Sequence, residues 1–157
     1  MTGLRPILVL NGPNLNMLGV REPHIYGHHT LGDVEDMCRE RAAALGVEVT
    51  FGQSNYEGEL VGMIQQARDG ASGIVINPGA YTHTSVAIYD ALKLAELPVI
   101  EVHLSNPHRR EEFRHHSYIS LVAEGIVAGF GARSFVMAIE GMVGYLRRQV
   151  PAGGPGD

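Results

Sequence analysis

Five short apolar segments, separated by longer stretches with polar positions, constrain the fold of this chain more than any other feature. They are rich in β-branched residues and nearly continuous in hydrophobicity, which is typical of parallel strands covered on both faces. Parallel strands need a crossover between them, and that crossover is usually a helix. The segments are residues 7–10, 47–51, 73–77, 99–103 and 125–130.

Four other stretches carry apolar residues at the three- and four-residue spacing of a helix. The first follows Thr30, which can form a capping box with Asp33, and it should stop at Gly46. The others are expected over residues 57–68, 85–95 and 134–148. Alternating strands and helices predict an α/β fold, a flavodoxin-like three-layer sandwich in which helices cover both faces of a five-stranded parallel sheet.

Length and composition indicate one domain. The chain has 157 residues, of which 45% are hydrophobic and 18% charged, an ordinary globular balance. We therefore expect a single flavodoxin-like domain over residues 1–150. The last segment, "PAGGPGD" (151–157), has nothing apolar to bury and is predicted to be disordered.

Charge, hydropathy and cysteine content exclude several classes of protein. The net charge of −5 disfavours nucleic acid as a partner, because phosphate binding needs clustered lysine and arginine. The longest uncharged stretch, 70–89, contains Asn77, Pro78 and His83, so no membrane span is predicted. Cys38 has no partner for an internal disulfide, and the first apolar run is too short for a signal peptide, so we expect a cytoplasmic protein.

Polar side chains gather after three of the predicted strands. The segments are "NGPNLNMLGVREPHIYG" after the first, "NPGAYTHTS" after the third and "EVHLSNPHRREEFRHHS" at the fourth. Taken singly, Asn77 could be a turn former, His103 a hydrogen-bonded core residue and Arg114 a solvated charge. Because carboxyl ends of parallel strands share one edge of the sheet, their convergence favours a ligand site. Its candidates are Asn14, Arg21, Tyr26, Asn77, His83, Glu101, His103, Ser105 and Arg114.

Metal and nucleotide sites have little support. The eight histidines include the pairs His28-His29 and His115-His116, but neither pair has a cysteine, aspartate or further histidine at a familiar ligand spacing. The loop "NGPNLNMLG" lacks both glycine patterns that cradle phosphates. We expect no metal and no cofactor.

Acid–base chemistry fits the same residues better. Glu101 and His103 lie two apart on one strand, so their side chains share a face and the carboxylate can orient the imidazole as a general acid. Tyr26 is a candidate base if Arg21 stabilises its anion, because a phenol with a pKa of about 10 is otherwise a poor base near neutral pH. The segment 19–30 would then be a lid that closes over the pocket.

The three polar segments closely resemble the signature blocks of the type II 3-dehydroquinate dehydratases, in the same order and over about residues 7–146. The resemblance implies a flavodoxin-like catalytic subunit without metal or organic cofactor, assembled as a homododecamer built from trimers. It implies reversible anti elimination of water from 3-dehydroquinate to 3-dehydroshikimate through an enolate. That reaction belongs to the shikimate pathway, which leads to chorismate and the aromatic amino acids.

The resemblance also implies a role for each site residue. Tyr26 would accept the proton as a tyrosinate supported by Arg21, His103 oriented by Glu101 would protonate the departing hydroxyl, and Asn14 would stabilise the enolate. The binding residues would be Asn77, Leu104 and Ser105 for the substrate carboxylate, His83 and Arg114 for the ring hydroxyls, and Asp90 for a neighbouring subunit's site. His24, His28 and His29 receive no role and should either face solvent or merely tune the loop.

Two other classes of protein would use the same sheet edge. A flavin- or nucleotide-binding protein would not need Tyr26, Arg21 and the Glu101–His103 pair together. An inactive interaction protein should have lost one of these acid–base partners, and this sequence retains them all.

Overall fold

The computed structural model describes residues 3–20 and 22–149. Its five strands form one sheet in the order β2-β1-β3-β4-β5, and each neighbouring pair is parallel. This is the flavodoxin-like order, so the predicted α/β fold is confirmed. The strands are β1 (Ile7–Asn11), β2 (Val49–Gln53), β3 (Gly73–Asn77), β4 (Val99–His103) and β5 (Gly125–Ala128).

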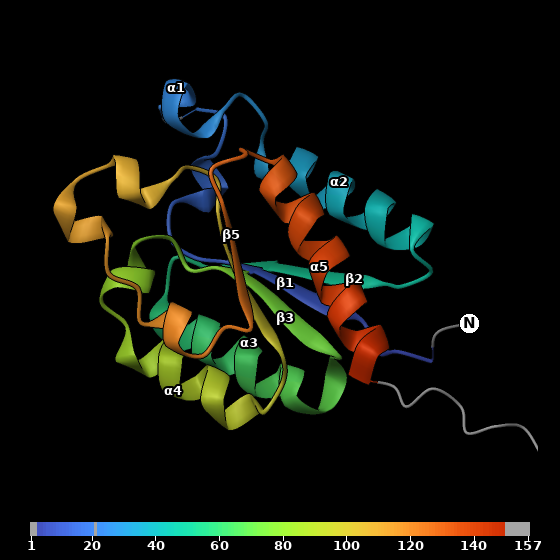
Figure 1. Cartoon of the computed structure of the whole chain (residues 1–157). Helices are drawn as coiled ribbons and strands as arrows, with labels where there is room; N and C mark the ends of the chain where they lie inside the picture. Colours follow the sequence, from blue (N-terminus) through green and yellow to red (C-terminus); the bar gives the residue numbers. More distant parts are fainter. Residues whose placement is uncertain (1–2, 21, 150–157) are drawn as a thin grey trace, which may run out of the picture.

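Four long helices cover the sheet, and Figure 1 shows them in two layers. The helices α2 (Leu31–Ala44) and α5 (Arg133–Gln149) lie on one face, and α3 (Glu57–Gly70) and α4 (Val86–Ala95) on the other. The period of two along β1 divides its side chains between two cores. Ile7 and Val9 pack with α2 and α5, whereas Leu8 and Leu10 pack with α3 and α4.

The ends of α2 show how local sequence sets element boundaries. Thr30 and Asp33 form the predicted capping box, with distances from amide nitrogen to side-chain oxygen of 2.9 and 3.1 Å. At the other end Gly46 adopts φ 77°, and the amide of Val47 donates to the carbonyl of Ala42. That cap occupies Val47, so β2 begins at Val49 and the strand predicted over 47–51 is displaced by two residues.

Short elements lie mainly at the carboxyl ends of the strands. The four-residue helix α1 (Pro23–Tyr26) was not predicted, because it is too short to show periodicity, although proline suits its first turn. The predicted fifth strand stops at Ala128, two residues early, since Gly129 turns the chain with φ 97°. The 3₁₀ turns are η1 (Leu15–Met17), η2 (Gly79–His83), η3 (Pro107–Arg109), η4 (Glu112–Arg114) and η5 (Ile119–Leu121).

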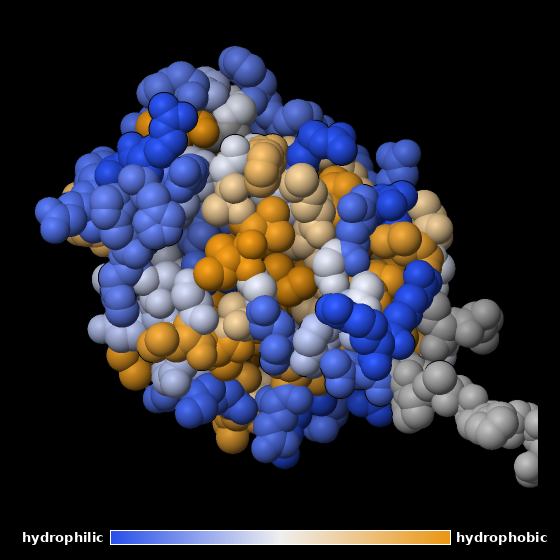
Figure 2. Space-filling model, viewed as in Figure 1, coloured by the Kyte–Doolittle hydropathy of each residue, from blue (hydrophilic) through white to orange (hydrophobic). Residues whose placement is uncertain are grey.

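The edge strand β5 is less covered than a strand with helices on both faces. Ile126 on β5, Phe130 after it and Met137 on α5 are 56%, 60% and 40% exposed. Figure 2 shows an apolar area in the middle of this face, over β5 and the start of α5. The expectation that the strands are covered on both faces is therefore wrong for β5.

Two sequence predictions fall outside the described residues. Arg21 is one, and the tail predicted to be disordered over 151–157 is the other. Within the described part of the chain, none of the helices has the length and apolar character needed to cross a bilayer.

Candidate active site

A pocket of about 130 Å³ lies at the carboxyl ends of β1, β3 and β4. The strand order changes direction between β1 and β3, which is where doubly wound sheets bind their ligands. Most of the candidate residues meet in this pocket. Those that line it are Asn14, Asn77, His83, His103, Leu104, Ser105 and Arg114.

The loops after β1 and β3 touch through their backbones, which brings their polar residues together. The amide of Gly12 donates to the carbonyl of Asn77 at 2.8 Å. A Cβ on Gly12 would lie 2.2 Å from the carbonyl oxygen of Pro78, and one on Gly79 would lie 3.0 Å from that of Pro13. Gly79 also has a φ of 61°. Glycine is therefore required on both sides of this contact.

Asn14 is held in a left-handed backbone conformation, with φ 69°, at the start of η1. Its amide donates to Oδ1 of Asn55 at 3.0 Å. Gln53, the last residue of β2, donates through Nε2 to the same Oδ1 and to the carbonyl of Gly12, both at 3.2 Å. Sequence reasoning missed these two supporting residues, although "QSN" follows a predicted strand just as the other polar segments do.

Asn77 both shapes a turn and lines the pocket, so both predictions made for it describe its position. Its side chain is buried, and Oδ1 accepts the amide of Gly79 at 3.1 Å, so it shapes the turn after β3. The same residue lines the pocket. A turn former and a site residue are therefore not alternatives at this position.

Glu101 and His103 form a hydrogen-bonded pair between Oε2 and Nε2, as their spacing predicts. Glu101 is only 1% exposed. Burial acts to raise the pKa of its carboxyl, but hydrogen bonds from His103, Ser120 and Ser117 and the charge of His103 outweigh burial and leave the pKa below its ordinary value of 4.5. Glu101 is therefore a carboxylate at neutral pH, and it can orient and charge the imidazole.

His83 and Arg114 reach the pocket from η2 and η4. His83 Nδ1 lies 2.7 Å from the carbonyl of His116, and burial lowers the pKa of His83, so this imidazole is neutral at pH 7. Arg114 donates from Nε to Glu111 at 2.8 Å and also lines the pocket, so its ion pair does not keep it out of the pocket wall. Arg110 lines the pocket too, and sequence reasoning did not select it, although it precedes Arg114 by four residues in the same block.

The remaining candidates either lie apart from the pocket or fall outside the described residues. Arg21 lies outside the described residues, as does the side chain of Tyr26, whose backbone ends α1. Asp90 is exposed on α4 and does not line the pocket. The Glu101–His103 pair is thus the part of the acid–base machinery that the structure brings together.

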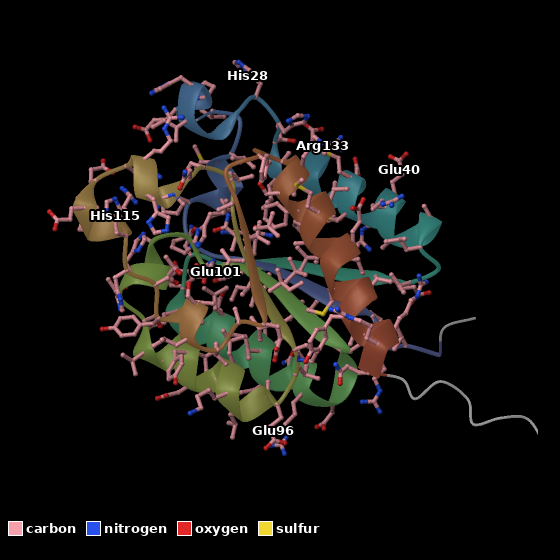
Figure 3. The ribbon with its side chains drawn as sticks, in the orientation of Figure 1. His28, Glu40, Glu96, Glu101, His115 and Arg133 are labelled. Atoms are coloured by element: carbon pink, nitrogen blue, oxygen red, sulfur yellow. The ribbon has the colours of Figure 1, made fainter. Side chains whose placement is uncertain are left out.

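The two ends of the segment 19–30 lie against each other, with Gly19 beside the carbonyls of His28 and His29. Gly19 has a φ of 90°, and a Cβ there would lie 3.2 Å from the carbonyl oxygens of both His28 and His29. Compact loops with adjoining ends often carry function. His24, His28 and His29 are exposed, as predicted, and Figure 3 shows His28 pointing away from the molecule.

A buried carboxylate–imidazole pair beside a polar pocket, at the switch point of a doubly wound α/β sheet, is the arrangement of an acid–base enzyme. Among residues 3–20 and 22–149, no group of three or more His, Cys, Asp or Glu side chains is placed to hold a metal ion.

Comparison with known proteins narrows this class. The model of the class II dehydroquinase family matches residues 5–143, so the chain belongs to that family. A 3-dehydroquinate dehydratase of Phenylobacterium zucineum is 59% identical over 91% of this chain and 99% of its own.

Solved structures agree with the family assignment. The type II dehydroquinase of Butyrivibrio crossotus has a TM-score of 0.85 at 47% identity, covering 88% of this chain and 97% of its own. That of Propionibacterium acnes has a TM-score of 0.86 at 44% identity, with coverage of 89% and 97%.

Proposed function

We propose that the pocket at the ends of β1, β3 and β4 is where this chain dehydrates 3-dehydroquinate. The chain has the 3-dehydroquinate dehydratase activity of its relatives, which are 54–61% identical to it, and it is a hydro-lyase of the shikimate pathway. The single observation that carries the placement of the reaction is the buried Glu101–His103 pair, whose imidazole faces a pocket lined by hydrogen-bonding groups.

The reaction needs three things from the protein. A proton beside a ketone must be removed, the enolate oxygen must be stabilised, and a hydroxyl must be protonated as it leaves. His103 is the proton donor: the imidazolium gives a proton to the departing oxygen as the C–O bond breaks, and water forms. Glu101 keeps the positive ring in place until that transfer.

Tyr26 is the proposed base, working as a tyrosinate whose charge Arg21 stabilises. The resemblance in sequence supports these two roles. The loop geometry is consistent with these roles, because Gly19 lies against the carbonyls of His28 and His29 and so holds the two ends of the segment together. Figure 1 places α1 at the same end of the molecule as η3 and η4. Closure of this lid over bound substrate would exclude water.

The substrate is held by groups of different character around the pocket. We assign its carboxylate to Asn77, Leu104 and Ser105 at the ends of β3 and β4. The ring hydroxyls go to His83, whose neutral imidazole can accept a hydrogen bond, and to Arg114. Asn14 polarises the enolate oxygen. In each case the support is the position of the residue on the pocket wall together with the resemblance.

Replacement of the base tests the assignment directly. Tyr26→Phe should lower kcat by at least about 100-fold, because general base catalysis contributes on that order, while binding of substrate measured by calorimetry is largely retained. Turnover is followed by the ultraviolet absorbance of the enone product. Tyr145→Phe, on α5 and away from the pocket, is the matched control. Wild-type turnover in Tyr26→Phe would refute the role of Tyr26.

The role of Arg21 has its own test. Arg21→Ala should lower kcat and move a limb of the pH–rate profile, because the tyrosinate loses its neighbouring cation. An unchanged profile with full activity would mean that Arg21 is only a surface charge.

The subunit is also proposed to assemble as a homododecamer built from trimers. The exposed apolar area around Ile126, Phe130 and Met137 supports burial against another copy, and Asp90 on α4 would enter the neighbour's site. Sedimentation gives the assembly size. Inactive Asp90→Ala and Tyr26→Phe subunits should regain activity when mixed, because some sites then combine two intact residues. Failure to complement would remove the shared site.

We further propose that the enzyme works in the cytoplasm without a metal. The buried, unpaired thiol of Cys38 suits a reducing compartment. Activity should survive dialysis against EDTA, and loss that added zinc restores would contradict the metal-free assignment.

A further inference from the structure

The carboxylate of Glu101 is surrounded by hydroxyl groups from two other segments, η2 after β3 and the chain around η5 before β5. Ser120 donates to Oε1 at 2.6 Å and Ser117 donates to Oε2 at 2.9 Å. Thr82 Oγ1 lies 3.3 Å from Oε2. Thr82 belongs to η2 and Ser120 to η5, while Ser117 lies between η4 and η5. Figure 3 shows Glu101 in the middle of the fold, whereas His115 lies at its edge.

Each hydroxyl has one proton to donate. Ser117 is closer to Oε2 than Thr82 is, at 2.9 Å against 3.3 Å, so the arrangement that suits the distances best has Ser117 donating to Glu101 and Thr82 donating to Ser117 across their 2.5 Å contact. Thr82 therefore supports Ser117, and Ser117 and Ser120 are the direct donors to the carboxylate. With His103 at Oε2, both oxygens of Glu101 are occupied by donors.

Such an arrangement is needed because a carboxylate that is 1% exposed has lost almost all of its hydration. A protonated Glu101 would donate to Nε2 of His103 and leave the imidazole neutral. An ionised Glu101 accepts from Nε2, so a positive ring carries its second proton on Nδ1. The donors to Glu101 thus decide whether the ring beside the pocket is charged.

We propose that Ser117 and Ser120 are positioning residues for catalysis, which keep Glu101 ionised and aligned on Nε2 so that His103 presents its acidic proton to the substrate. The proposal rests on the role of His103 as the proton donor. It adds that the donor's charge is set by two hydroxyls which do not line the substrate pocket.

Other charged and titratable groups surround Glu101 from several elements. A second cavity, of about 330 Å³, is lined by Glu101 together with His103 on β4, His83 on η2, His108 on η3, Arg114 on η4, and His115 and His116 after η4. Arg114 is engaged by Glu111, and His83 by the carbonyl of His116. The interactions that lower the pKa of Glu101 against the effect of burial come from His103, Ser120 and Ser117.

The test compares Ser120→Ala and Ser117→Ala with Ser120→Thr, which keeps the hydroxyl. Ser72→Ala is the matched control, because Ser72 donates to the carbonyl of Arg5 at 2.6 Å, at the opposite end of β3. The enone absorbance gives kcat and KM as functions of pH, and thermal unfolding checks that each variant folds.

Losing a donor raises the pKa of Glu101. As the pH is lowered, the alanine variants should therefore lose activity at a higher pH than the wild-type enzyme does. In both alanine variants the midpoint of the acidic limb of kcat should move up by about 1 on the pH scale, so kcat on that limb should be about 10-fold below wild type. At pH 7, where Glu101 stays ionised, kcat should change little, and KM should stay within about 2-fold of wild type. Ser120→Thr and Ser72→Ala should keep the wild-type midpoint. If one alanine variant does not fold, the other makes the same prediction.

The outcomes separate this proposal from the assignment beneath it. Wild-type turnover in His103→Ala would refute the assignment of His103 as the proton donor. If His103→Ala is inactive while folded Ser120→Ala or Ser117→Ala keeps the wild-type acidic limb, the positioning role is wrong and the assignment of His103 stands. An equal fall of kcat at every pH, without movement of the limb, would likewise reduce the serines to structural residues.

Discussion

Gly12 is the position where one added methyl group should damage the active site most. It lies between β1 and Asn14, and its amide donates to the carbonyl of Asn77 at 2.8 Å. In Gly12→Ala the new Cβ would stand 2.2 Å from the carbonyl oxygen of Pro78 and 2.5 Å from its carbonyl carbon. Both neighbours are backbone atoms, so no side chain can rotate out of the way.

The size of the effect follows from these distances. Ordinary contact begins near 3.4 Å, so the loops after β1 and β3 must separate by about 1 Å. Overpacking of this kind costs about 3 kcal/mol, at the upper end of its usual range, which for a chain of this size lowers Tm by about 6–12 °C. A shift of about 1 Å between Asn14 and Asn77 should also lower kcat/KM by about 100-fold.

The assay measures enone absorbance and thermal unfolding side by side. Gly62→Ala is the control, because this glycine lies inside α3 and a Cβ there has open space within 4 Å. It should raise stability by about 0.5–1 kcal/mol and leave kcat/KM unchanged. Wild-type kcat/KM and Tm in Gly12→Ala would refute the claim that the backbone contact between the two loops positions the site.

Three further predictions concern stability and reactivity. Ser85→Ala should lower the free energy of unfolding by about 1 kcal/mol in urea titration, because the buried Ser85 Oγ accepts the amide of Ile88 at the start of α4; no change would mean that another group caps the helix. Burial raises the pKa of Cys38 to about 12, so a disulfide reagent at pH 8 should label it only after denaturation, and rapid labelling of the native enzyme would contradict its burial. The folded pKa of Glu101 lies below 4.5, so its stabilisation is present above that pH and is lost as the pH falls; Tm should therefore vary less between about pH 5 and pH 3 in Glu101→Gln, and an unchanged slope would show that other carboxyls dominate.

The fold could be predicted because its signals are local. The buried strands β3 and β4 are continuous apolar runs, and their predicted bounds match the structure. The start of β2 was predicted two residues too early for a local reason. Val47 is apolar and so resembles a strand residue, but its amide closes the cap of α2. The exposure of β5 could not be predicted, because a run such as "GIVAGF" does not reveal that it lies at a sheet edge.

The site was predictable only where chain order and strand geometry act together. The alternation of side chains along β4 placed Glu101 beside His103, and the shared edge of parallel strands placed Asn77 near Asn14. Ser117 and Ser120 were missed because they belong to irregular chain between η4 and β5, and no periodicity says that this segment folds back on β4. Contacts between distant irregular segments require the tertiary structure.

The same turns that shape the substrate pocket also hold the acid–base pair, and this links the two functions. On η2, Thr82 is buried and supports the hydroxyl network at Glu101, while the next residue, His83, lines the pocket. Successive residues on one short turn therefore face the hydroxyl network at Glu101 and the proposed substrate pocket. A hydrogen bond from the amide of Tyr118 to the carbonyl of Thr82, at 2.9 Å, joins η2 to the segment that carries Ser117 and Ser120. One connected piece of structure therefore carries both His83 at the pocket wall and the hydroxyl groups around Glu101.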